Sequence, residues 1–264
     1  MTKIKEITDF LEEIAPLHYQ ESYDNAGLIF GDQNAEVTGV LISLDLTEEV
    51  LEEAIEINCN LVISHHPIIF RGIKKFTGYY VDRVVAKAIK NDIAIYAIHT
   101  NLDNVLDNGV NGKIAEKIGL EDLEVLNANL NLSDDGRVGS GVLGRLAKPL
   151  AYHSFMDHLK KSMELQVIKH TELLDGEVKR VAICGGSGSF LLNAAIGADA
   201  DVFITADFKY HEYFDADRKI VIMDIGHYES ERFTINLLHD LLNEKFRKFA
   251  PRCTKVNTNP VKFY

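Results

Sequence analysis

Short apolar runs typical of buried strands alternate with amphipathic, helix-like segments along the whole chain. The runs at 61–63, 93–98 and 220–223 consist of apolar residues. Other segments are helix-like: in 3–15, for example, apolar side chains recur every three or four positions, as on one face of a helix. Strands separated by helices predict an α/β fold with largely parallel or mixed sheets flanked by helices.

The pattern divides into two halves of similar layout, 1–125 and 126–264. The stretch that most resembles a linker, 126–137, is rich in Asn and Asp but short. A chain of 264 residues, 46% of them hydrophobic, can bury one large core or two smaller ones. We therefore predict two similar α/β lobes that pack as one compact unit.

Charge and cysteine content exclude several classes of protein. A formal net charge of -12 disfavours a general surface for nucleic acid or anionic membranes. Cys59, Cys184 and Cys253 are widely spaced and form no CxxC pattern, which indicates reduced thiols. The first residues lead into an amphipathic pattern rather than a signal peptide, and no apolar run reaches the roughly 20 residues that span a bilayer. We expect a soluble cytoplasmic protein.

The first candidate motif, Ser64-His65-His66-Pro67, directly follows the run at 61–63. In open α/β sheets, functional residues collect outside the carboxyl ends of the strands. Neighbouring side chains at a strand end diverge, so His65 and His66 would reach two different ions, as in a two-metal hydrolytic site. The alternative is a surface histidine pair that precedes a proline turn.

Two further motifs combine histidine and carboxylate, a donor set that suits zinc, iron, manganese or similar ions. In His99-Thr100-Asn101-Leu102-Asp103, the carboxylate of Asp103 could be a ligand, a bridge or an Asx-turn cap, and His99 could orient a ligand or substrate. His227 and Glu231, four residues apart, can point the same way from a helix. Glu231 could equally stabilise the start of that helix, and Glu229 is the closest competing ligand.

A glycine-rich segment follows another strand-like run. Its candidate anion-binding residues are Gly185, Gly186, Ser187 and Gly188. Backbone amides of such a turn can hold a phosphate or carboxylate, although a simple tight turn explains the glycines as well. Asp207 and His211, after the next run, could supply a proton-transfer group or hydrogen bonds that hold the residues of the site. Equally, Asp207 could only cap the helix that carries His211.

In their order, these motifs resemble the Nif-three-like family (NGG-interacting factor three homologues), whose members are also named type 2 GTP cyclohydrolase I homologues. The resemblance covers essentially the full chain. It rests on Tyr23-Asp24-Asn25-x-Gly27-Leu28, Ser64-His65-His66-Pro67, His99-Thr100-x-Leu102-Asp103, Gly185-Gly186-Ser187-Gly188, Thr205-x-Asp207 and Gly226-His227-x3-Glu231. The chain departs from the family at Tyr23, where relatives usually have Trp.

The resemblance implies a Nif-three-like fold and a toroidal homohexamer. It also implies two divalent metal ions per subunit, such as zinc, iron or manganese. The ligands carried over are His65, His66, Asp103, His227 and Glu231, with the two carboxylates as bridges. Some relatives carry an inserted middle domain, for which this chain is too short.

The resulting functional expectation is a metal-dependent hydrolase similar to type 2 GTP cyclohydrolase I. Activated water would attack the purine ring of a nucleotide or a related substrate. His99, Asp207 or His211 would move protons, and the glycine-rich turn would hold a phosphate. The alternative is a regulatory toroid that binds a protein or nucleic acid and uses its metal structurally; salt-dependent DNA binding would identify the nucleic-acid version. A metal chaperone or storage protein is a third reading.

Overall fold

The computed structural model describes residues 2–247 and 249–264, and these form two compact units. Unit 1 consists of the chain up to Leu102 together with Thr234–Lys262, and unit 2 of Asp103–Phe233 with Phe263–Tyr264. In sequence, unit 2 is therefore an insertion into unit 1. The division differs from the boundary expected near residue 125, because the segment after Leu102 already packs on the second sheet and the last long helix returns to the first unit.

Unit 1 is built around one mixed sheet. Its elements are α1 (Ile4–Ile14), η1 (Leu17–Tyr19), β1 (Gly27–Phe30), β2 (Val40–Ser43), α2 (Glu48–Glu56), β3 (Leu61–Ser64), α3 (Tyr80–Lys90), β4 (Ala94–Ala97), α4 (Thr100–Asp103, which crosses the boundary), α9 (Thr234–Lys245) and β11 (Arg252–Cys253). Among the described residues the strand order is β1-β4-β3-β2-β11, with β1 antiparallel to β4 and the other neighbours parallel.

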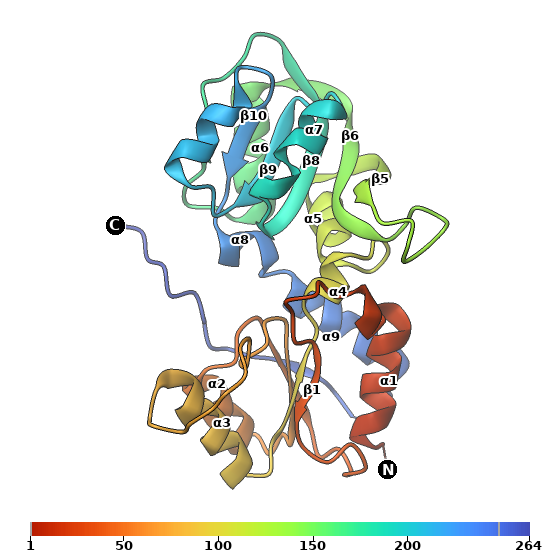
Figure 1. The fold of residues 1–264 in the computed structure, drawn as a ribbon, viewed down its shortest axis with the longest axis vertical. Coiled ribbons are helices and arrows are strands. Elements are labelled where there is room, and N and C mark those ends of the chain that lie inside the picture. Colours follow the sequence, from red (N-terminus) through yellow and green to blue (C-terminus); the bar gives the residue numbers. More distant parts are fainter. Residues whose placement is uncertain (1, 248) are drawn as a thin grey trace. The chain divides into compact units, whose positions relative to one another are not determined.

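Helices cover both faces of this sheet, which explains why its parallel strands are apolar without alternation. Helices α2 and α3 lie on one face and α1 and α9 on the other (Figure 1). Leu41, Val62 and Ile95 belong to the core on the α2–α3 side. Thr47 caps α2, since its hydroxyl accepts a hydrogen bond from the Val50 amide at 3.2 Å.

Unit 2 contains a second mixed sheet. Its elements are α5 (Val110–Ile118), β5 (Leu120–Ala128), β6 (Gly139–Ala151), α6 (Tyr152–Met163), β7 (Lys169–His170), β8 (Glu177–Ser187), η2 (Ser189–Leu191), α7 (Leu192–Gly197), β9 (Val202–Ala206), η3 (Tyr210–Ala216), β10 (Val221–Asp224) and α8 (His227–Glu231). The order is β5-β6-β8-β9-β10-β7. Among the described residues of unit 2, only β8, β9 and β10 pair in parallel, and the other neighbouring strands are antiparallel.

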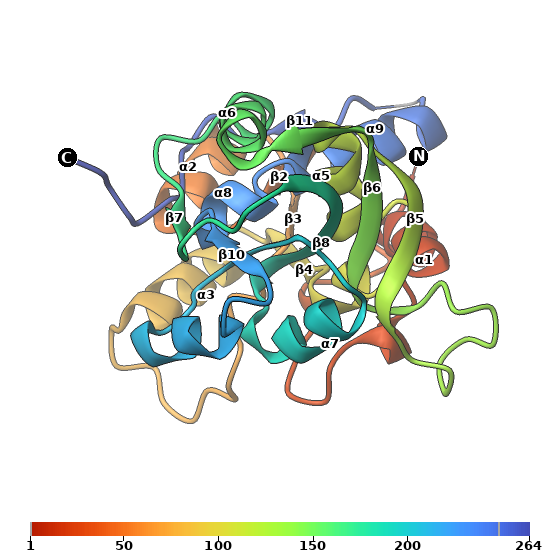
Figure 2. The same ribbon diagram turned by 90° about the horizontal axis from the view of Figure 1, so that it is seen from above.

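The helices of unit 2 are also distributed over both faces of its sheet. Helix α6 lies on one face and α7 on the opposite one (Figure 2). On the α7 side, Ala182, Phe203 and Ile222 from three neighbouring strands join Leu192 and Ala195 in one buried cluster. Each unit thus has its own core, and the predicted class of two α/β lobes with mixed sheets is confirmed.

Pro149 lies within a strand, because β6 continues through it to Ala151. The pairing of β6 with β8 is irregular between Arg145 and Leu150, so no ladder hydrogen bond needs an N–H group at Pro149. Helices α8 and α9 are separate although they are close in sequence, because α8 belongs to unit 2, α9 belongs to unit 1 and the chain leaves unit 2 after Phe233.

Strand β11 pairs with β2. Shortly after β11, the backbone amide of Lys255 donates to the Glu53 carboxylate. Within residues 2–247 and 249–264, none of the helices combines the length and apolar character that a bilayer-spanning segment needs.

Candidate metal centre

Three histidines of unit 1 gather at one edge of its sheet. Strands β3 and β4 are parallel and Ser64 is paired with Ala97, so the residues that follow both strands emerge side by side. The ring centroids of His65, His66 and His99 are 4.9–5.3 Å apart. One ring nitrogen from each lies within 4.8 Å of those of the other two, close enough to share an ion.

Every histidine in this cluster is held through its Nδ1 atom by an oxygen acceptor. The Nδ1 atoms of His65, His66 and His99 lie 2.8 Å from the Ile98 carbonyl, 2.7 Å from the Asp45 carboxylate and 2.8 Å from the Asp24 carboxylate. Because these oxygens only accept, each Nδ1 must carry the proton in the neutral ring. The lone pair is then on Nε2, the tautomer that oxygen partners impose on metal-binding histidines.

The Asp24 carboxylate has several hydrogen-bond donors. Besides its contact with His99, it accepts hydrogen bonds from the backbone amide and the hydroxyl of Thr100. Burial raises the pKa of Asp24, but the hydrogen bond and charge of His99, together with Thr100 and the Asn25 amide, lower it to about 2. Asp24 is therefore an ionised carboxylate behind His99 at neutral pH.

Asp45 holds His66 in the same way and links it to the C-terminal segment. Its second carboxylate oxygen accepts a hydrogen bond from the Thr258 hydroxyl at 2.7 Å. The interpretation of the sequence missed both Asp24 and Asp45. For Asp45 a signal was available, since it lies two residues beyond β2, the strand next to that of His66.

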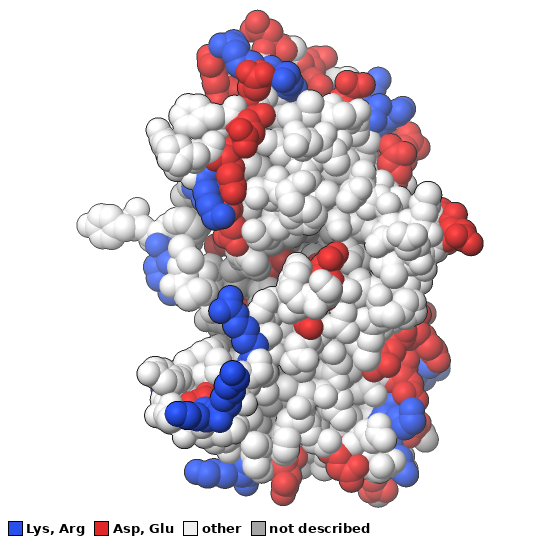
Figure 3. All heavy atoms as spheres, in the orientation of Figure 1, with Lys and Arg blue, Asp and Glu red and all other residues white. Residues whose placement is uncertain are grey.

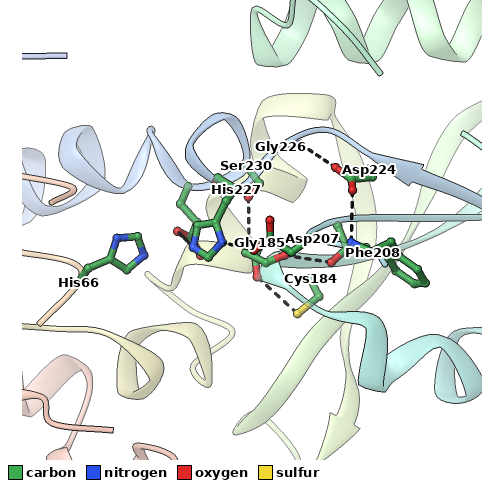
Figure 4. A network of polar contacts seen from close by, with 12 residues as sticks. His66, Cys184, Gly185, Asp207, Phe208, Asp224, Gly226, His227 and Ser230 are labelled. Carbon is green, nitrogen blue, oxygen red and sulfur yellow. Dashed lines mark hydrogen bonds and ion pairs between the residues drawn. The ribbon is translucent and has the colours of Figure 1, made fainter. Parts of the chain in front are cut away.

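Unit 2 holds a second cluster, at the end of its β10 strand. His227 is the first residue of α8 and Glu231 the last, and His227 Nε2 lies 3.1 Å from Glu231 Oε2, as the spacing of four predicts. A carboxylate oxygen of Asp103 lies within 4.8 Å of one from Glu231. Figure 4 shows the polar contacts around His227, whose Nδ1 is 2.7 Å from Asp207 Oδ2. Asp207 thus orients His227 as Asp24 orients His99.

The glycine-rich segment lies against this second cluster. It forms the end of β8, and Gly186 has a left-handed φ of 62°. A Cβ atom at Gly186 would lie 2.3 Å from Glu231 Oε1, so no larger residue fits without moving that carboxylate. The amides of Gly185 and Gly186 donate to Asn111 Oδ1 and Ser230 Oγ at 2.8 and 2.9 Å. Two of the amides expected to hold a phosphate are therefore engaged within the protein.

The remaining candidates lie outside these clusters. His211 is exposed on η3 and belongs to no group of described residues that could share an ion. The Glu229 carboxylate faces Gly226, where a Cβ atom would be 2.3 Å from it. Burial, with the charges of Asp103 and Glu231, raises the pKa of the Cys184 thiol, so this sulfur stays protonated and is a poor metal ligand.

Comparison with known proteins points to one family. The model of the family described as Duf34/NIF3 (NGG1p interacting factor 3) matches residues 2–260. Proteins named GTP cyclohydrolase 1 type 2 homolog from Campylobacter jejuni and Clostridium acetobutylicum are 32% and 30% identical, over 99% of this chain and 100% and 98% of theirs. A Staphylococcus epidermidis protein of the same name is 26% identical over an alignment of 366 residues, so it carries residues that this chain of 264 lacks.

Solved structures agree on the fold. Staphylococcus aureus protein SA1388 superposes with a TM-score of 0.90 and 28% identity, covering 100% of this chain and 99% of that one. A Bacillus cereus protein related to NIF3 has the same TM-score and coverage, with 26% identity.

Proposed function

The chain belongs to the Duf34/NIF3 family, and we propose that it is a metal-dependent hydrolase acting on a nucleotide. The observation that carries the proposal is the shared tautomer of three histidines. In His65, His66 and His99, Nδ1 is held by an oxygen acceptor and the lone pair is therefore on Nε2, as in histidines that bind a metal. The Nδ1 atom of His227 is likewise held by Asp207, and its Nε2 faces the Glu231 carboxylate.

We further propose that the chain binds two divalent ions, zinc, iron, manganese or similar. The ligands would be His65, His66, Asp103, His227 and Glu231, the set implied by the family. Helix α4 supports this assignment, because its single turn begins directly after His99 and ends at Asp103. Bound ions would supply the positive charge that activates water and polarises the substrate.

The remaining side chains have distinct roles in this proposal. His99 takes up the proton of the attacking water at Nε2, and the ionised Asp24 at its Nδ1 stabilises the resulting imidazolium. Asp45 and Asp207 fix the rings of His66 and His227. Of the two roles that the sequence leaves open for Asp207, proton transfer and positioning, its contact with His227 supports positioning, and exposed His211 has no role in this proposal.

The test is turnover of a panel of nucleotides that includes GTP, by protein of known metal content. His65→Ala should lose bound metal and more than about 100-fold of the activity, since even the partners of metal ligands contribute 10- to 100-fold. His153→Ala, an exposed histidine on α6, is the matched control and should retain both.

Full turnover by His65→Ala without metal would refute the proposal. Metal bound by the wild type with no turnover of any nucleotide would instead favour the regulatory ring. A homohexamer is part of the proposal through the family resemblance. Light scattering should give a mass near six times that of one chain.

A further inference from the structure

The loop that follows the histidine pair carries a cluster of basic and aromatic side chains. Between β3 and α3 the chain reads Phe70-Arg71-Gly72-Ile73-Lys74-Lys75-Phe76-Thr77-Gly78-Tyr79. Arg71, Lys74 and Lys75 are exposed, as are Phe76 and Tyr79. Figure 3 shows basic side chains gathered over the region where this loop lies in Figure 1. In a chain of net charge -12, such a patch is a local exception.

These three neighbouring cations lack the ion pairs that several other cations of unit 1 form. Elsewhere in the unit, Lys5, Arg83 and Lys87 form ion pairs with nearby carboxylates. By contrast, no hydrogen bond or ion pair within residues 2–247 and 249–264 involves the side chain of Arg71, Lys74 or Lys75. Three unneutralised cations within five residues repel one another, and an anion bound among them would remove that repulsion.

Both ends of the loop are fixed, whereas its centre is not. At the start, Asn25 Nδ2 donates to the Ile69 carbonyl at 2.7 Å. At the end, the Thr77 amide donates to Asp82 and the Tyr80 hydroxyl to the Leu46 carbonyl, both at 2.7 Å. No hydrogen bond of the described residues engages the backbone of 71–76. The basic segment can therefore adapt to a ligand while its ends stay in place.

Aromatic rings connect this loop to the histidine cluster. The Phe70 ring lies 6.0 Å from the His99 ring and 6.0 Å from Tyr23. Phe70 and Tyr23 are 45% and 61% exposed, so they present faces on which a flat heterocycle can stack. Arg71 is the next residue along the chain. Aromatic surface, candidate metal ligands and unpaired cations thus follow one another within unit 1.

We propose that Arg71, Lys74 and Lys75 bind the phosphate chain of a nucleotide whose base stacks on Phe70 and Tyr23. The proposal rests on the proposed function and specifies its substrate as a nucleoside polyphosphate. It also moves the phosphate site from the glycine-rich segment, whose Gly185 and Gly186 amides are engaged, to a loop with cations available. Guanidinium and ammonium groups are strong phosphate partners.

Calorimetric titration with GTP, inorganic tripolyphosphate and guanosine tests the site. The triple variant R71A/K74A/K75A should bind GTP and tripolyphosphate at least about tenfold more weakly, and guanosine unchanged. Phe70→Ala should weaken GTP and guanosine but leave tripolyphosphate binding intact. The control K148A/K160A/K161A removes the same charge from exposed positions of unit 2 and should behave as wild type.

The outcomes separate this proposal from the proposed function. Equal GTP and tripolyphosphate affinities in wild type, loop variant and control would overturn the loop site even if GTP is turned over. Wild-type protein that binds neither GTP nor tripolyphosphate would also overturn the loop site. In that case, turnover of a heterocycle without phosphate would still support the proposed hydrolase function. Loss of phosphate binding in the loop variant supports the site even where no turnover is found.

Discussion

At the scale of single residues, the two clusters of candidate metal ligands depend on neighbouring groups that are not themselves candidate ligands. Asp24, Asp45 and Asp207 each fix one histidine through Nδ1. Gly186 leaves the space that the Glu231 carboxylate occupies. Such partners determine which nitrogen is available and where it points, and their loss typically costs 10- to 100-fold in metal affinity.

Gly186→Ala should displace Glu231, since the new Cβ atom would lie 2.3 Å from its Oε1 and the backbone φ of 62° adds strain. We expect metal affinity to fall roughly 10- to 100-fold and stability by about 1–3 kcal/mol. Equilibrium dialysis and thermal melts measure the two effects. Gly197→Ala, with nothing within 4 Å of its added Cβ atom, is the control; equal behaviour of both variants would contradict the packing role.

A second residue-scale prediction concerns Glu12 of α1, which belongs to neither cluster. Burial and Asp9 raise the pKa of Glu12, against smaller opposing effects of Tyr96 and Lys5. Because the folded-state pKa is raised, ionising Glu12 destabilises the native state, and this loss develops as pH rises above about 4.3, the usual pKa of glutamate. Glu12→Gln should therefore be more stable than wild type at pH 7 and equal below about pH 4. Denaturant titrations at both pH values measure the free energy of unfolding of the two proteins. A difference between variant and wild type that is the same at both pH values would contradict the prediction.

At the scale of elements, the clusters are assembled where strands end. Parallel pairing of β2, β3 and β4 brings Asp45, His66 and His99 to one edge, although they are far apart in sequence. The extended segment after β11 reaches the same edge. There Thr258 donates to the Asp45 carboxylate that also holds His66.

Thr258→Val should loosen Asp45 and so weaken metal binding severalfold without unfolding unit 1, because one hydrogen bond contributes only about 1 kcal/mol. Thr254→Val is the matched control from the same segment: its hydroxyl bonds to Glu53, which contacts none of the histidines. Thr258→Val should bind metal more weakly than Thr254→Val, whereas the two variants should have similar melting temperatures. Identical metal affinities would show that the segment does not support His66.

At the scale of the whole molecule, the chain consists of two units, each with a sheet and a core of its own. Unit 2 is almost entirely one continuous segment, whereas unit 1 needs both ends of the chain. Strand β11 pairs with β2, and Leu238 and Leu242 of α9 are fully buried. A fragment that covers unit 2 should therefore fold by itself, whereas a fragment that covers only the first part of unit 1 should not.

A fragment of residues 103–233 should fold alone and melt cooperatively, because its sheet and the Phe203 cluster are complete. A fragment of residues 1–102 should not, since it lacks α9 and β11. Joining 234–262 to it through a flexible linker should restore a cooperative melt by circular dichroism. A cooperative transition in 1–102 alone, or its absence in 103–233, would contradict the division into units.

The sequence by itself determined the α/β class, most helices and strands, and the motifs that carry chemistry. These features are local, because each depends on residues that are close together in the sequence. Examples are the apolar runs, the helical periodicity, the Thr47 cap and the spacing of four between His227 and Glu231. Resemblance of motif order was sufficient to indicate the family that the chain belongs to.

Tertiary structure decided what depends on residues distant in the chain. That Asp24 holds His99 across 75 positions, and that Gly186 packs against Glu231, follows from strand order and from φ angles that no local pattern specifies. The break between α8 and α9 and the return of the last helix to unit 1 are likewise global. Burial and long-range hydrogen bonds are shared between segments, so neither segment alone reveals them.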